Sequence, residues 1–98
     1  MPSNILVIDD EEDIRHLIAE IFRDEGYVCQ EAQNSEFAIK YLGNHIPELI
    51  ILDIWLQGSE FDGIELLKLL KNDYPNIPVI MISGHADIET AVNTIKLG

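Results

Sequence analysis

Acidic residues gather where an apolar run ends near the start of the chain. The segment "ILVIDDEED" (residues 5–13) passes from four apolar residues directly to five consecutive acids. Asp53 stands alone between Leu52 and Ile54 in a second apolar run. Carboxylates bind hard cations such as Mg²⁺, and an aspartate can accept a phosphoryl group when a metal neutralises the transferred oxygens. These residue types suggest a cation site and phosphoryl transfer, provided that the fold brings them together.

The apolar pattern predicts strands and helices in strict alternation. Four runs predict strands: "NILVI" (4–8), "YVCQEA" (27–32), "ELIILDI" (48–54) and "IPVIMIS" (77–83). Helical spacing predicts helices from about residue 14 to Gly26, over "NSEFAIKYLGNH" (34–45), over "GIELLKLLKNDYP" (63–75) and from Asp87 to Gly98. Such alternation implies an α/β fold, in which right-handed crossovers place helices on both faces of a parallel sheet.

The predicted helices have recognisable inner faces and ends. Apolar residues at helical spacing are Ile14, Leu17, Ile18, Ile21 and Phe22 in the first helix, and Ile64, Leu67 and Tyr74 in the third. We expect Gly26 to end the first helix, and Asn34 or Ser35 to cap the second. Pro75 prevents the third helix from continuing.

The polar positions fall at the carboxyl ends of predicted strands, the edge where open α/β sheets bind ligands. Asp9 and Asp10 follow the first strand, Asp53 ends the third, and Ser83 follows the fourth. If the first and third strands are neighbours, their spacing of about 4.8 Å brings these carboxylates close together. At about 4 Å and an effective dielectric constant of 20, each carboxylate pair repels by roughly 4 kcal/mol.

The sequence offers no basic side chain to offset this repulsion. The six basic residues all fall on predicted helices: Arg15, Arg23, Lys40, Lys68, Lys71 and Lys96. A helix N-terminus carries only about half a charge. A divalent cation is left, and Mg²⁺ suits a shallow site with one or two carboxylates, several waters and phosphate oxygens. In this hypothesis Asp9 and Asp10 bind Mg²⁺, Asp53 accepts the phosphoryl group, and the Ser83 hydroxyl contacts it.

Composition limits the class of protein. The 98 residues fit one domain, and a formal charge of −12 disfavours direct binding of this domain to nucleic acid or anionic membranes. No signal peptide or membrane span is recognised, so we expect a cytoplasmic location. Cys29 is the only cysteine, which excludes an internal disulfide.

At these residues the chain resembles the receiver domain of two-component response regulators, which has a flavodoxin-like (CheY-like) fold. The matching motifs are "VIDDEED", "IILDIW", "FDG" (the turn that opens the third helix) and "MISGHAD", and they cover nearly the whole chain. The resemblance implies Asp53 as phosphoacceptor and Ser83 as switch hydroxyl. It implies that Asp10 binds Mg²⁺ directly, that Asp9 acts through water, and that Asp53 and the Trp55 backbone carbonyl complete the metal site.

The resemblance also implies partners and a longer protein. A sensor histidine kinase would supply the phosphoryl group. The loop "DIWLQGSEFDG" is similar to that of nitrogen-regulation activators of the NtrX and NtrC type, whose chains continue into AAA+ and DNA-binding output domains. The family's fold has strand order 2-1-3-4-5, with a phosphate-contacting lysine on the fifth strand. The sequence stops at Gly98, before that strand, so we expect residues 1–98 to be an incomplete receiver that self-associates through its strand-four edge.

Other interpretations remain open. The acids at 9–13 could be a solvated first helical turn, Asp53 a strand-end cap, and Ser83 part of a turn. The chain could also be a receiver-like binding or dimerisation module that is never phosphorylated. A haloacid-dehalogenase-like phosphatase is disfavoured, because such enzymes carry a second Asp two residues after the nucleophile, where this chain has Trp55. We therefore expect a signalling domain and not an enzyme.

Overall fold

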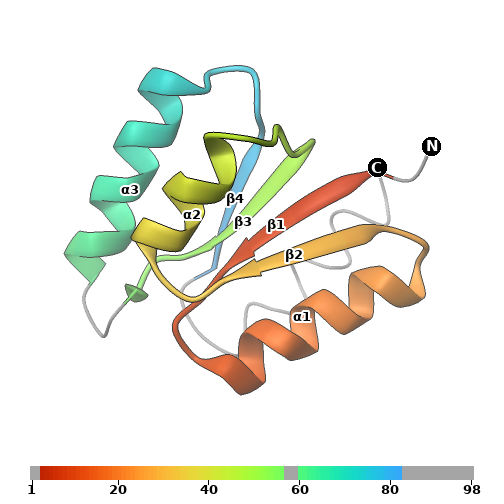
Figure 1. Ribbon diagram of the computed structural model, residues 1–98. Helices are drawn as coiled ribbons and strands as arrows, with labels where there is room; N and C mark the ends of the chain where they lie inside the picture. The colour runs from red at the N-terminus through yellow and green to blue at the C-terminus, as the bar shows by residue number, and fades with distance from the viewer. Residues whose placement is uncertain (1–2, 57–59, 83–98) are drawn as a thin grey trace.

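The computed structural model describes residues 3–56 and 60–82, and within them strands and helices alternate (Figure 1). The elements are β1 (Asn4–Ile8), α1 (Glu12–Asp24), β2 (Val28–Ala32), α2 (Ser35–Leu42), β3 (Leu49–Asp53), α3 (Glu60–Asp73) and β4 (Val79–Ile82). All four predicted strands and the first three predicted helices are confirmed. The fourth predicted helix lies outside the described residues.

The strands form a parallel sheet in the order β2-β1-β3-β4. β1 and β3 are therefore neighbours, as the sequence analysis required. Ile8 at the end of β1 pairs with Leu52 of β3, so that the residues following them, Asp9 and Asp53, reach the same edge of the sheet. Among the described strands, β4 is the outer strand on one side and β2 on the other.

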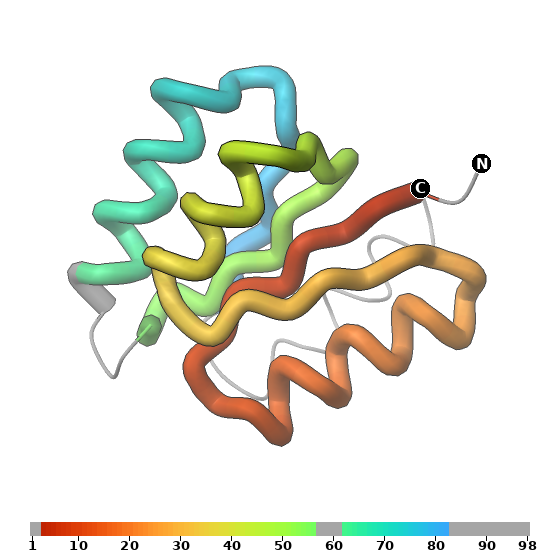
Figure 2. Tube along the Cα trace, in the orientation of Figure 1, coloured from red at the N-terminus to blue at the C-terminus, as the bar shows by residue number. Residues whose placement is uncertain are grey.

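Helices cover both faces of the sheet, with α1 on one face and α2 and α3 on the other (Figures 1 and 2). Alternate residues of β1 contribute to two separate cores, because successive side chains of a strand point to opposite faces. Ile5 and Val7 pack with Ile18 and Phe22 of α1. On the other face, β1 and β3 side chains pack with α2 and α3, as shown by Leu6, Ile8, Leu52, Ala38, Leu66 and Leu70. Burial on both faces explains the continuous apolar runs of β1 and β3.

The inner face of α1 matches the predicted one at Ile14, Ile18, Ile21 and Phe22 and differs at Leu17. Ile18, Ala19 and Phe22 are buried, whereas Leu17 is 50% exposed. The buried positions follow the spacing i, i+3, i+4 and i+7 that begins at Arg15, so a basic residue occupies the first position of the inner stripe. The prediction for Leu17 was wrong because the apolar spacing fits two neighbouring helical phases.

The helix ends follow local chemistry. Gly26 has φ of +95° and its N–H donates to the carbonyl of Arg23, so it ends α1 as predicted. The side chain of Asn34 accepts a hydrogen bond from the Phe37 N–H at 3.0 Å, which identifies Asn34 as the cap of α2.

Helix α3 begins at Glu60, so the "FDG" segment (61–63) lies in its first turn and not in a turn before it. Leu67 and Tyr74 pack against the core, as predicted, but the most deeply buried positions of α3 were not predicted. Leu66 and Leu70 are its fully buried leucines, whereas Ile64, Leu67 and Tyr74 are only partly buried. None of the described helices is both long and apolar enough to span a membrane.

Candidate functional site

Three carboxylates meet at the carboxyl edge of the sheet. One oxygen each of Asp9, Asp10 and Asp53 lies within 4.8 Å of the others. Asp9 and Asp10 follow β1 and Asp53 ends β3, so the pairing of these two strands creates the cluster. The structure thus brings together the three acids that the sequence analysis selected. Ser83 lies outside the described residues.

The two strand-end carboxylates are buried and held by backbone groups. Asp9 is 2% exposed and its Oδ1 accepts a hydrogen bond from the Glu11 N–H at 2.9 Å. Asp53 is 7% exposed and its Oδ1 accepts one from the Trp55 N–H at 3.0 Å. In both cases an aspartate bonds to the backbone two residues ahead, which fixes the direction of its carboxylate.

Burial and mutual repulsion make the ionised form of Asp9 unfavourable. Burial raises the pKa of Asp9 from 3.8 to about 7, the hydrogen bond from Glu11 opposes the rise, and the charges of Asp53 and Asp10 add to it. Within residues 3–56 and 60–82, no Lys or Arg side chain forms an ion pair with these three aspartates. These three side chains therefore concentrate negative charge with no basic ion-pair partner among the described residues.

This donor set fits a hard divalent cation. All three side chains offer oxygen ligands, which Mg²⁺ and Ca²⁺ prefer over nitrogen or sulfur. Asp10 is exposed, so the cluster is open to solvent on one side and leaves room for water or phosphate oxygens. Burial and the neighbouring carboxylates raise the pKa of Asp9, and a cation bound beside it would favour its ionised form.

The backbone of the loop after β3 is held by hydrogen bonds at Ile54 and Trp55. Trp55 is 47% exposed, and its backbone N–H is the group that holds Asp53. The Ile54 N–H donates to the carbonyl of Ile82 at 2.9 Å, which ties this loop to the end of β4. The segment following the candidate acceptor is thus bonded to both the acceptor and the neighbouring strand.

Sequence reasoning missed two residues near the site, Arg15 and Glu31. Arg15 was assigned to a helix with no role at the sheet edge, but its Nη1 donates to the backbone carbonyl of Asp9 at 3.0 Å. Its Nε forms an ion pair with Glu31 of β2 at 3.1 Å. A usable signal was present, because Arg15 stands at helical spacing before Ile18, Ala19 and Phe22.

Comparison with known proteins identifies the family. A model of the response regulator receiver domain matches residues 5–98. The chain belongs to this family. Its parallel sheet with helices on both faces is the receiver fold, as the sequence analysis expected.

Several similar proteins are regulators of the NtrX type. The "Nitrogen assimilation regulatory protein NtrX" of Azorhizobium caulinodans is 51% identical over 98 residues, which cover 100% of this chain and 22% of the relative. The crystal structure of the receiver domain of NtrX from Brucella abortus is 50% identical, with a TM-score of 0.77 over 96% of this chain and 78% of that one. The expected similarity to NtrX-type regulators is confirmed. The chain spans about a fifth of the length of the curated NtrX-type relatives.

One solved relative contains a modified aspartate. It is a response regulator protein from Burkholderia pseudomallei with a phosphorylated aspartic acid, a calcium ion and citrate. The two sequences are 32% identical, and the TM-score is 0.76 over 98% of this receiver domain and 55% of that chain.

Proposed function

We propose that this receiver domain is a phosphorylation-controlled signalling module of the cytoplasm that accepts a phosphoryl group on Asp53 from a sensor histidine kinase. The observation that carries the proposal is the placement of a buried strand-end carboxylate, Asp53, within 4.8 Å of Asp9 and Asp10. The Burkholderia pseudomallei relative, with its phosphorylated aspartic acid and calcium ion, supports the same chemistry.

Each residue of the site has a proposed role. Asp10, which is exposed, binds Mg²⁺ directly, and the buried Asp9 acts through water. Asp53 and the backbone carbonyl of Trp55 complete the metal site, and the Ser83 hydroxyl contacts the transferred group. A bound Mg²⁺ would offset the charge of the carboxylates and of the phosphoryl oxygens.

The transfer exchanges one bond to phosphorus for another. A carboxylate oxygen of Asp53 forms a bond to the phosphorus of a phosphohistidine while the phosphorus–nitrogen bond breaks. The electron pair of the broken bond stays on the nitrogen, and the imidazole leaves as a neutral ring that carries its proton on the other nitrogen. The hydrogen bond from the Trp55 N–H holds the Asp53 carboxylate in a fixed direction for the attack.

The modified domain would control output domains of a longer protein. The NtrX-type relatives are about five times as long as this chain, and the resemblance to NtrX and NtrC regulators implies AAA+ and DNA-binding domains in the remainder. With a formal charge of −12, the domain itself is not expected to contact nucleic acid. We also propose self-association through the edge of β4, which is the outer described strand on its side of the sheet.

Intact-mass measurement tests the proposed function. The chain and its Asp53→Asn variant are incubated with a small acyl phosphate, with Mg²⁺ or with excess EDTA. We expect one phosphoryl adduct, formed only with Mg²⁺ and absent from Asp53→Asn. No adduct in any sample would favour the alternative of a binding module. Light scattering over a range of concentrations tests the self-association, and a monomeric mass throughout would contradict it.

A further inference from the structure

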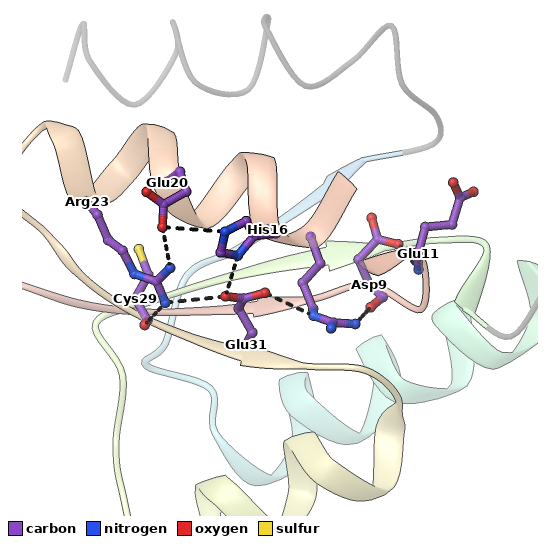
Figure 3. Close-up of polar contacts among 8 residues, drawn as sticks. Asp9, Glu11, His16, Glu20, Arg23, Cys29 and Glu31 are labelled. Carbon is purple, nitrogen blue, oxygen red and sulfur yellow. Dashed lines mark hydrogen bonds and ion pairs between the residues drawn. The ribbon is translucent and has the colours of Figure 1, made fainter. Parts of the chain in front are cut away.

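A network of charged side chains connects β2 and α1 to the turn that carries Asp9 and Asp10 (Figure 3). Within this network, Arg15 is the residue that contacts the backbone of Asp9. The side chain is 12% exposed, and it uses two nitrogens on two different partners. Its Nε donates to Glu31 Oε1 at 3.1 Å and its Nη1 to the Asp9 carbonyl at 3.0 Å. The planar guanidinium therefore bridges the second strand and the end of the first.

Glu31 is itself held in place from its other side. Its Oε2 lies 3.4 Å from His16 Nδ1 and 3.4 Å from Arg23 Nη2. Arg23 also donates to the Cys29 carbonyl at 2.9 Å and forms an ion pair with Glu20. In Figure 3 Glu31 lies between Arg23 on one side and Asp9 on the other, with His16 above it. One carboxylate oxygen of Glu31 thus accepts a hydrogen bond from Arg15, while the other lies 3.4 Å from both His16 and Arg23.

The carbonyl oxygen that accepts the hydrogen bond from Arg15 lies between two of the candidate metal ligands along the chain. The Asp9 carbonyl belongs to the peptide unit that joins Asp9 to Asp10. Because this unit is planar, a hydrogen bond to its oxygen restricts the backbone rotation that sets the directions of both side chains. Groups that orient metal ligands from behind contribute strongly to metal affinity in other sites.

We propose that Arg15, held by Glu31, is a positioning residue for the cation site formed by Asp9, Asp10 and Asp53. This inference rests on the proposed function, because it requires that the cluster binds Mg²⁺. Arg15 contacts neither the cation nor the phosphoryl group. It acts by fixing the peptide unit between two of the ligands.

The effect of charge alone would have the opposite sign. The positive charge of Arg15 lies close to the cluster and repels an incoming cation, so its removal would strengthen Mg²⁺ binding if charge were its only contribution. Loss of positioning would weaken Mg²⁺ binding. The direction of the change in Kd therefore separates the two explanations.

The chain offers a matched control for this charge. Arg23 lies about two turns further along α1 and also contacts Glu31, but it does not contact Asp9. Arg23→Met removes the same charge from the same network and leaves the Arg15 bond to the Asp9 carbonyl in place. Arg15→Lys keeps the charge, but a single ammonium group lacks the fork that reaches both partners.

Mg²⁺ titrations at pH 8 test the proposal, with the fluorescence of the single Trp55 and calorimetry as independent readouts. We expect Arg15→Met to raise the Kd for Mg²⁺ about tenfold, at the lower end of the range for groups that support metal ligands. Arg23→Met leaves the Kd unchanged or lowers it. Arg15→Lys weakens binding relative to the unmodified chain despite its unchanged charge. Circular dichroism and urea unfolding verify that each variant is folded.

The outcomes are distinct. If Arg15→Met binds Mg²⁺ as tightly as Arg23→Met, or more tightly, the positioning role is overturned while the cation site stands. If Arg15→Met does not fold, Arg15→Lys decides, and a Kd equal to that of the unmodified chain overturns the proposal. If the unmodified chain does not bind Mg²⁺, the proposed function fails and this inference fails with it.

Discussion

Gly63 in the first turn of α3 lies directly against the backbone of Ile54, the residue that follows Asp53. A Cβ atom at position 63 would lie 2.6 Å from the carbonyl carbon and 2.7 Å from the Cα of Ile54, closer than real contacts allow. A helix start is thereby packed onto the loop that holds the candidate acceptor. The missing side chain of Gly63 is what permits this approach.

Gly63→Ala should destabilise the fold by about 1–3 kcal/mol, because the added methyl group forces the backbone of α3 or of the loop to move. Urea unfolding at equilibrium measures the change. Gly43→Ala is the matched control, since a Cβ at Gly43 would lie at an ordinary 3.4 Å from the Lys40 carbonyl oxygen and its φ of −67° suits alanine. Equal unfolding midpoints for the two variants would show that α3 accommodates the methyl group.

Without a divalent cation, the contribution of Asp9 to the stability of the fold should fall as the pH rises from about 4 to 7. The pKa of Asp9 is 3.8 when unfolded and about 7 when folded, so the folded state holds its proton more tightly in this range. The contribution of Asp9 is fully present below pH 3.8 and is lost as the pH rises through about 7, with an upper limit of roughly 4 kcal/mol.

Asp9→Asn should remove this part of the pH dependence and stabilise the chain at pH 8 by about 1–3 kcal/mol, because no charge has to be formed at this buried position. Urea unfolding in EDTA at pH 5.5 and pH 8 provides the comparison. The prediction fails if the variant and the unmodified chain lose stability in parallel between these two pH values.

Mg²⁺ should stabilise the folded chain at pH 8, because a cation that binds the native cluster shifts the unfolding equilibrium. At a free concentration 100 times the Kd, the gain is about 2.7 kcal/mol. Thermal unfolding with Mg²⁺ and with EDTA measures it. Asp10→Asn should reduce this stabilisation by Mg²⁺, since Asp10, the exposed member of the cluster, is the residue proposed to bind the cation directly. A gain of equal size in that variant would place the bound cation elsewhere.

The thiol of Cys29 should react only when the chain unfolds. Cys29 is 4% exposed, and burial raises the pKa of its thiol to about 11, so the reactive thiolate is scarce at neutral pH. The labelling rate of this single cysteine with a thiol reagent should therefore equal the rate of a free thiol multiplied by the equilibrium constant for unfolding. Labelling of the native chain at the rate of a free thiol would contradict the burial of Cys29.

The strands of this receiver domain were predictable because they depend on local pattern. β1 and β3 are covered on both faces, and their continuous apolar runs identify them without further information. The meeting of Asp9 with Asp53 was predictable from the same source, because two adjacent parallel strands bring their carboxyl ends to one edge.

Two features could not be predicted from the sequence. One is which face of α1 is buried, and the other is the close contact between α3 and the loop after β3. The apolar spacing in α1 fits either a stripe through Leu17 or a stripe through Ala19, and packing against the sheet selects the latter. Arg15 is brought inward by this choice, and its contact with Asp9 follows. Gly63 was expected at the start of a helix, but the contact that requires glycine is with Ile54, which belongs to a different element.

The surplus of acids has a consequence for how a phosphorylated state would be recognised. The formal net charge of −12 already counts Asp53 as negative, so a phosphoryl group on it would change this charge by about one unit or less. Salt screens such a change within about 8 Å. A partner docked on a remote surface would experience almost the same electric field before and after the reaction. A phosphoryl group would therefore have to be sensed as a shift of atoms next to Asp53, and the contact between Ile54 and Gly63 is one point at which such a shift would reach a helix.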